Sequence, residues 1–142
     1  MDDTYTASAS TAIDAPPETV WDGLTDPDLI EQYFFGARVE TDWTVGSPIV
    51  WQGEWEGEPY EDKGEILAVE PAERLVYTHW SPLSGEPDVP ENYHTLTYEL
   101  TAREDGTEVT MTQDNNATEE ARDHSEENWT AMLEGLRELL ER

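Results

Sequence analysis

The sequence of 142 residues contains no cysteine and only one lysine, Lys63. Without cysteine, disulfides and thiolate metal sites are excluded, so the packed core must hold the fold together. The sequence also lacks a run of about 18 apolar residues, and its first residues carry neither basic side chains nor an apolar stretch. We therefore expect no membrane span, no signal peptide and a cytoplasmic protein.

Basic residues are few, and acidic residues dominate the composition. There are 34 Asp and Glu against 7 Lys and Arg, which gives a formal net charge of −27. A field of this sign repels phosphates and anionic lipids, so neither nucleic acid nor a membrane surface is an expected partner. The acids are spread along the chain and form no block. This favours a surface adapted to high salt, as in a halophile, over a tail that binds a basic partner.

Hydrophobic periodicity predicts helices near both ends of the chain and strands between them. Alternation with period two predicts a first strand over residues 5–13, and proline-containing start signals predict two short helices behind it. Over residues 37–113 the period is again two, interrupted by turn residues, which predicts about six antiparallel strands. A change of phase between Ile66 and Leu67 predicts a bulge, and either face of residues 74–80 fits the inner set.

The last segment, residues 118–142, predicts a long amphipathic helix, with Asn116 and Glu119 at the spacing of a capping box. Its apolar stripe is bulky towards the C-terminus and small or polar in the first turns. One face must therefore be buried, and the strand-rich middle supplies the surface that covers it. Strands followed by a segregated helix indicate an α+β fold, in which a curved antiparallel sheet surrounds the helix and residues 1–142 form a single domain.

Several stretches, taken in their order, resemble a known family. They are Trp21-Asp22-Gly23-Leu24-Thr25-Asp26-Pro27, Gly64-Glu65-Ile66, residues 71–78, the Gly106-Thr107-Glu108-Val109 hairpin and the helix from Trp129 to Leu140. On these residues the chain resembles the activator of Hsp90 ATPase homologue 1-like family, a branch of the START/Bet v1-like (SRPBCC) superfamily. The resemblance implies a helix-grip fold with six to seven strands and two short helices after the first strand. It also implies a cavity between sheet and helix, which in many relatives binds an apolar small molecule.

The implied cavity would lie between the inner faces of the strands and the long helix. Bulky residues fill space and small ones leave it, so we expect the cavity to open near Ala121, Ser125 and Trp129. The other interpretation is that inward aromatic residues are ordinary core. The candidate cavity-lining residues are Trp51, Trp55, Tyr77, Tyr98, Met111, Gln113, Ala121, Ser125, Trp129, Met132 and Leu133.

Motifs of catalysis and metal binding are missing from the sequence. It has no Gly-rich phosphate loop with lysine, no His-Glu-x-x-His and no Gly-x-Ser-x-Gly, so we expect no cofactor and no metal. His79 and His94 lie in predicted strands and are the candidates for a general base or a ligand-orienting group. A hydrogen-bonded structural histidine is the alternative for both. Asp62, Lys63 and Glu65 could offer acid–base chemistry, but a solvated strand face is the favoured interpretation.

Three functional hypotheses stay open. The favoured one is a carrier or sensor module that binds an apolar or aromatic small molecule and carries out no chemistry. The second is a cyclase- or hydrolase-type enzyme that uses His79 or His94 with a carboxylate, which requires a polar pair inside the cavity. The third is a chaperone-associated stress protein with an Hsp90-type partner. It requires an exposed apolar patch, for which so acidic a surface leaves little room.

Overall fold

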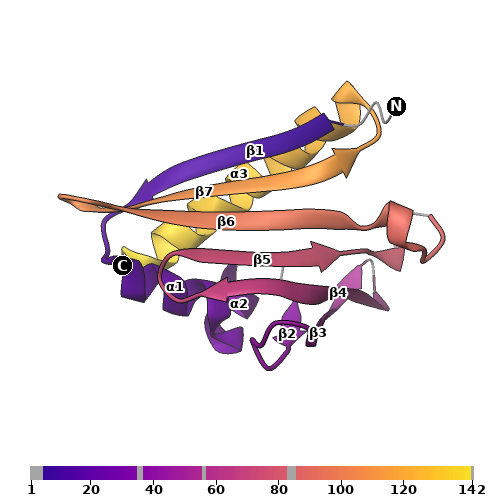
Figure 1. Ribbon diagram of the computed structural model, residues 1–142, viewed down its shortest axis with the longest axis horizontal. Helices are drawn as coiled ribbons and strands as arrows, with labels where there is room; N and C mark the ends of the chain where they lie inside the picture. The colour runs from indigo at the N-terminus through magenta and orange to yellow at the C-terminus, as the bar shows by residue number, and fades with distance from the viewer. Residues whose placement is uncertain (1–4, 35–36, 56, 83–85, 142) are drawn as a thin grey trace.

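The computed structural model describes residues 5–34, 37–55, 57–82 and 86–141, and the side chain of Trp55 lies outside the described part. Strands and helices follow one another as the periodicity predicts, and Figure 1 labels them. In chain order they are β1 (Tyr5–Ile13), α1 (Pro17–Thr25), α2 (Pro27–Tyr33), β2 (Arg38–Glu40), β3 (Pro48–Trp55), β4 (Glu58–Glu70), β5 (Arg74–His79), a 3-10 turn (Pro90–Asn92), β6 (His94–Arg103), β7 (Gly106–Asn116) and α3 (Glu119–Leu140).

All seven strands form one antiparallel sheet in the order β1-β7-β6-β5-β4-β3-β2. Figure 1 shows α3 crossing one face of this sheet, behind β1, β7 and β6, with α1 and α2 beside its C-terminal end. We call the face that α3 covers the inner face. The predicted α+β helix-grip architecture, with two short helices after the first strand, is confirmed.

Helix α3 begins where the sequence predicts it, but its cap lies two residues after the predicted capping-box residue. Its N-cap is Thr118, whose Oγ1 accepts a hydrogen bond from the backbone N–H of Ala121 at 3.0 Å. The capping box predicted at Asn116 is therefore wrong. Asn116 is instead the last residue of β7 and is only 3% exposed. Its side chain forms hydrogen bonds on the inner face, which are described below.

The middle strands bend where the sequence changes phase. The register between β4 and β5 shifts between Ile66 and Ala68, which confirms the predicted bulge. Leu75 and Tyr77 are buried in the central core cluster, so these residues and His79, which follows in the same phase, form the inner set of β5. The orientation that the sequence left open is thereby fixed.

The aliphatic core lies under the C-terminal half of α3. Met132, Leu133 and Leu136 are at most 1% exposed. Helix α1 approaches α3 closely at this point, because a Cβ on Gly23 would lie 2.8 Å from Cδ1 of Leu136. The same cluster includes aliphatic residues of the sheet and of α1 and α2, among them Ile13, Val20, Leu24, Ile30, Leu96 and Val109. This end of the inner face is solidly packed.

Candidate ligand site on the inner face of the sheet

Five aromatic side chains form a continuous cluster between α3 and the middle of the sheet. Phe34, directly after α2, has its ring centroid 5.9 Å from that of Trp129 in α3 and 6.4 Å from that of Trp51 in β3. The ring of Trp51 lies 5.1 Å from Tyr77, which lies 5.7 Å from Tyr98. Rings at these separations attract one another in tilted and offset arrangements. We call these five residues the aromatic cluster.

The structure brings four of the predicted cavity residues into this cluster, namely Trp51, Tyr77, Tyr98 and Trp129. Phe34 is not among the predicted residues, because the short helix before it carries too few turns for a hydrophobic face to be assigned. The only signal for Phe34 in the sequence is its position. It is an aromatic residue at the end of a helix, and that helix must fold back towards α3.

A small hollow borders the aromatic cluster. Its cavity volume is about 10 Å³, roughly the space of one water molecule. Tyr33, Phe34, Trp51, Tyr77 and Tyr98 line it, together with Trp43 and aliphatic residues of α1, α2, β2 and β3. Any ligand larger than water therefore requires side chains of this wall to move.

Three tyrosine hydroxyls lie in or near the wall of the hollow. The hydroxyls of Tyr77 and Tyr98 are 2.7 Å apart and buried, and the hydroxyl of Tyr33 donates to the backbone oxygen of Gly23 at 2.6 Å. Burial raises the pKa of Tyr33, Tyr77 and Tyr98 well above the ordinary tyrosine value. All three hydroxyls are therefore neutral at neutral pH and act as hydrogen-bonding groups.

A carboxylate–histidine pair adjoins the cluster. Oδ2 of Asp62 lies 2.9 Å from Nε2 of His79, and the two side chains are only 12% and 14% exposed. The ring of His79 meets Trp51 edge-on at 4.9 Å. Asp62 stands directly opposite Trp51 in the register of β3 and β4, so both side chains point to the same face. The other oxygen of the carboxylate, Oδ1, is buried and has no hydrogen-bond partner among the described residues.

The close approach of β4 and β5 brings this pair together. A Cβ on Gly64 would lie 1.7 Å from the backbone oxygen of Thr78, so only glycine permits the two strands to lie as they do. Asp62 is thus buried on the inner face, and its interpretation as a solvated residue is wrong. The sequence signal that could have revealed this is the spacing to Ile66. The two residues are four positions apart in one strand and therefore point to the same face.

The second candidate histidine has a structural contact. His94 faces His79 in the register of β5 and β6, but its Nδ1 lies 2.8 Å from the backbone oxygen of Asp114 in β7. It is half-buried and takes no part in the pair with Asp62. Of the two candidates, His79 is the one placed beside the aromatic cluster.

Polar side chains of β7 fill the small-residue end of α3. Oγ of Ser125 donates to Oδ1 of Asn116 at 3.1 Å, and the indole N–H of Trp129 donates to the side-chain oxygen of Gln113. Gln113 and Asn116 are 6% and 3% exposed. Amide side chains therefore lie against Ser125 and Trp129, where we expected the cavity to open, because buried polar groups at this end bond to one another. Met111, Met132 and Leu133 are fully packed core residues.

Comparison with known proteins places the chain in a family. The sequence profile of the activator of Hsp90 ATPase homolog 1-like proteins matches residues 14–141. The chain belongs to this family. The match confirms the resemblance seen in the sequence and covers every residue of the aromatic cluster. No protein of curated function shows a significant sequence match.

Solved structures of the same architecture include a close relative. The solution structure of ChR145 from Cytophaga hutchinsonii is 53% identical, with a TM-score of 0.85, over 96% of this chain and 94% of that one. The crystal structure of MLL2253 from Mesorhizobium loti is 28% identical, with a TM-score of 0.77, over 97% and 98% of the two chains. CalU16 from Micromonospora echinospora, at 22% identity and a TM-score of 0.73 over 96% and 85%, shares the fold.

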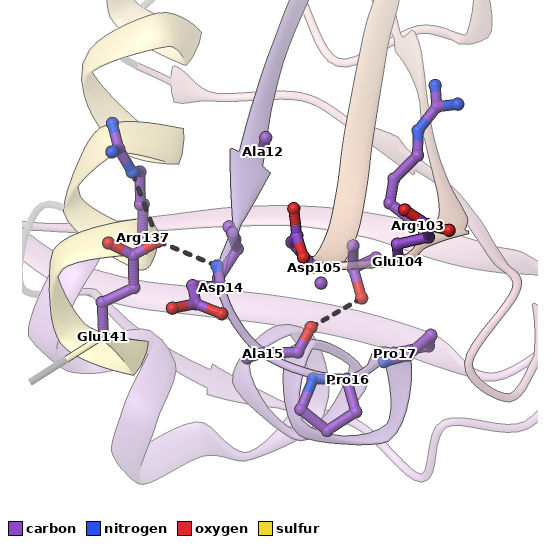
Figure 2. A pocket seen from close by; sticks show the side chains of 13 residues that line it. Ala12, Asp14, Ala15, Pro16, Pro17, Arg103, Glu104, Asp105, Arg137 and Glu141 are labelled. Carbon is purple, nitrogen blue, oxygen red and sulfur yellow. Dashed lines mark hydrogen bonds and ion pairs between the residues drawn. The ribbon is translucent and has the colours of Figure 1, made fainter.

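A hollow much larger than the one beside the aromatic cluster lies at the end of the sheet that carries the β6–β7 turn. It is an open groove of about 1160 Å³ between the β1–α1 turn, the β6–β7 turn and the end of α3 (Figure 2). Several of its polar groups are bonded to one another: the N–H of Asp14 donates to Glu141 at 2.8 Å, and Arg137 pairs with the same carboxylate at 3.4 Å. Arg103, on the far side in Figure 2, pairs with Glu108. These contacts close the end of the fold, and we assign no ligand to the groove.

Two further properties concern the described residues alone. None of their helices is both long and apolar enough to cross a membrane. Within the same residues, no group of three or more histidine or acidic side chains has the arrangement of a metal site.

Proposed function

We propose that the chain is a binding module for an apolar or aromatic small molecule, which lies among the rings of the aromatic cluster. The observation that carries this proposal is the cluster itself, because five rings from α3, the end of α2 and three strands converge beside a hollow with buried hydroxyls. Binding sites for small molecules are typically lined by aromatic side chains with a few fixed polar groups. A core that served packing alone would not need so many polar atoms.

Phe34 is the side chain whose movement would admit the ligand. Its ring lies between Trp51 and Trp129 and borders the hollow. It follows α2, a helix of only seven residues, and its backbone is held by hydrogen bonds to Ile30 and Ala37, so the movement would be one of the side chain. A flat ligand that takes the place of this ring would keep the contacts with both tryptophans.

The test removes the ring of Phe34 by mutation and then adds a small aromatic molecule that can bind in its place. Phe34→Ala removes a buried phenyl group and is expected to lower stability by about 3–5 kcal/mol. Met132→Ala, which truncates a buried side chain in the aliphatic core, is the matched control. Toluene at millimolar concentration should raise the thermal midpoint of Phe34→Ala clearly more than that of Met132→Ala, because a ligand that binds only the folded state stabilises it. Equal shifts for the two variants, or no shift for either, would contradict the proposal.

A second candidate function is an enzyme of the cyclase or hydrolase type. The Asp62–His79 pair supports it, because a carboxylate that holds one imidazole nitrogen leaves the other, Nδ1, available as a general base. Hydrolysis of aryl acetates should then be faster than with free imidazole, and both His79→Gln and Asp62→Asn should abolish the difference. Unchanged rates in His79→Gln would exclude this function for the pair.

The chaperone-associated alternative has less support. Among the described residues, the large exposed apolar side chains are Val45 and Leu67, at 62% and 41% exposure. They come from different segments, a turn and the outer phase of β4, and a docking surface for a protein partner needs contiguous apolar area.

A further inference from the structure

The feature that goes beyond an apolar site is the unpaired oxygen of a buried carboxylate. The whole residue Asp62 is 8% exposed, and its Oδ2 is hydrogen-bonded to His79. Its Oδ1 is buried and has no hydrogen-bond partner among the described residues. Native structures rarely keep a buried polar atom without a partner, since its desolvation is not compensated. The atom lies on the inner face, opposite Trp51 of the aromatic cluster.

Three rings lie near this carboxylate, those of Trp51, His79 and Tyr60. Trp51 and His79 meet edge to face at 4.9 Å, and the ring of Tyr60 lies over Gly53, where a Cβ would be 2.7 Å from the tyrosine hydroxyl. Burial and the nearby charge of Asp62 raise the pKa of Tyr60. Flat walls of this kind favour a flat ligand, which would present its edge to the carboxylate.

Charge restricts what can approach Oδ1. The nearest basic residue in sequence, Lys63, is paired with Asp88 and lies 5.8 Å from the ring of Trp80. With a net charge of −27 on the chain, an anionic group near Asp62 would be repelled. The group that satisfies Oδ1 must therefore be a neutral or cationic hydrogen-bond donor.

We propose that Asp62 is the polar anchor of the ligand and that its Oδ1 accepts a hydrogen bond from a hydroxyl or amino group on an aromatic ring. The ligand class is thus a phenol-like or aniline-like molecule, and aromatic carboxylates are excluded. His79 holds the other oxygen and fixes the direction of the anchor. This inference rests on the proposed function, because it names the polar half of a ligand whose apolar half contacts the aromatic cluster.

Three probes of similar size distinguish recognition of a hydrogen-bond donor on the ligand from recognition of its aromatic ring. They are 4-ethylphenol, which can donate, 4-ethylanisole, whose oxygen cannot, and 4-ethylbenzoate, which is an anion at neutral pH. Dissociation constants from NMR titration of the wild-type chain should favour 4-ethylphenol over 4-ethylanisole about tenfold or more, the usual range for a hydrogen bond to a charged group. The anion should bind weakest. This comparison needs no variant.

The variant Asp62→Asn then assigns the preference to one residue. The amide has the same size but no charge, so the ratio between 4-ethylphenol and 4-ethylanisole should fall to about threefold or less. Glu61→Gln, a change of the exposed neighbouring acid on β4, is the matched control and should keep the wild-type ratio.

The outcomes separate the two proposals. Equal binding of 4-ethylphenol and 4-ethylanisole by the wild type would overturn the anchor and leave the binding module intact. A preference that persists in Asp62→Asn would also overturn it, because the donor would then be recognised elsewhere. Failure of all three probes and of toluene to bind would overturn the proposed function together with the anchor.

Discussion

The two ends of the space between α3 and the sheet are built from different chemistry. At the C-terminal end of α3, the buried side chains of the helix are all aliphatic, namely Met132, Leu133 and Leu136. At the other end, rings, amides and the Asp62–His79 pair share the same inner face. The small hollow is bordered by rings of the aromatic cluster as well as by aliphatic residues of α1 and α2, and the unpaired carboxylate oxygen belongs to Asp62, which stands opposite Trp51. The comparison teaches that one end of this inner face supplies stability, whereas the other has groups that packing alone does not require.

The largest effect should come from the aliphatic end. Leu136 is 0% exposed, so Leu136→Ala should lower the free energy of unfolding by about 2–5 kcal/mol in urea denaturation. Leu67→Ala, at a residue that is 41% exposed, is the control and should change stability by about 0.5 kcal/mol or less. A loss below about 1 kcal/mol for Leu136→Ala would show that this end is not the solid core.

A smaller and non-additive effect should mark the aromatic end. Tyr77→Phe and Tyr98→Phe each leave the partner hydroxyl buried and unpaired, so each should cost about 1–3 kcal/mol. The double variant should cost clearly less than the two losses added together, because it removes both hydroxyls. Additive losses in denaturant unfolding would mean that the 2.7 Å contact contributes nothing specific.

The smallest effect should come from the contact between Glu141 and the β1–α1 turn, beside the groove in Figure 2. The backbone N–H of Asp14, with a smaller contribution from Arg137, lowers the pKa of Glu141. A lowered pKa in the folded state stabilises the fold above the unfolded pKa of about 4.3, and this stability is lost as the pH falls through the folded value. Glu141→Gln should therefore be slightly less stable than the wild type at pH 7, and the difference should be smaller near pH 3.

A difference that persists at low pH would show that the Glu141 contact does not depend on its charge. Glu138→Gln, at an exposed position of α3, provides the control for removing one acid from this helix. Unfolding by urea at the two pH values measures both variants.

The fold could be predicted from the sequence because its signals are periodic and local. Alternation gave the strands, and the phase change after Ile66 gave the bulge. The site was only partly predictable, because it depends on which strands lie side by side. Trp51 and Asp62 face one another through the register of β3 and β4, and His79 reaches Asp62 only because Gly64 has no side chain.

Two expectations from the sequence concern the position of the cavity and the reason for the acidic composition. The cavity near Ala121, Ser125 and Trp129 stays a prediction, and its weak point is that a long amide side chain from β7, Gln113, reaches across to Trp129 of the helix. The interpretation of the acidic composition as an adaptation to high salt stays a prediction. It requires the thermal midpoint to rise from low salt to molar salt, since screening weakens the repulsion of a chain with net charge −27.

If ligands bind at the aromatic end, an NMR titration of the wild-type chain should locate them there. With 4-ethylphenol added to the isotope-labelled chain, the indole N–H signals of Trp51 and Trp129 should shift most, and the methyl signals of Leu136 should stay in place. Signals can be assigned from Trp51→Phe and Trp129→Phe. Shifts confined to the groove residues of Figure 2, such as Ala12 and Thr107, or no shifts at any concentration, would contradict the account.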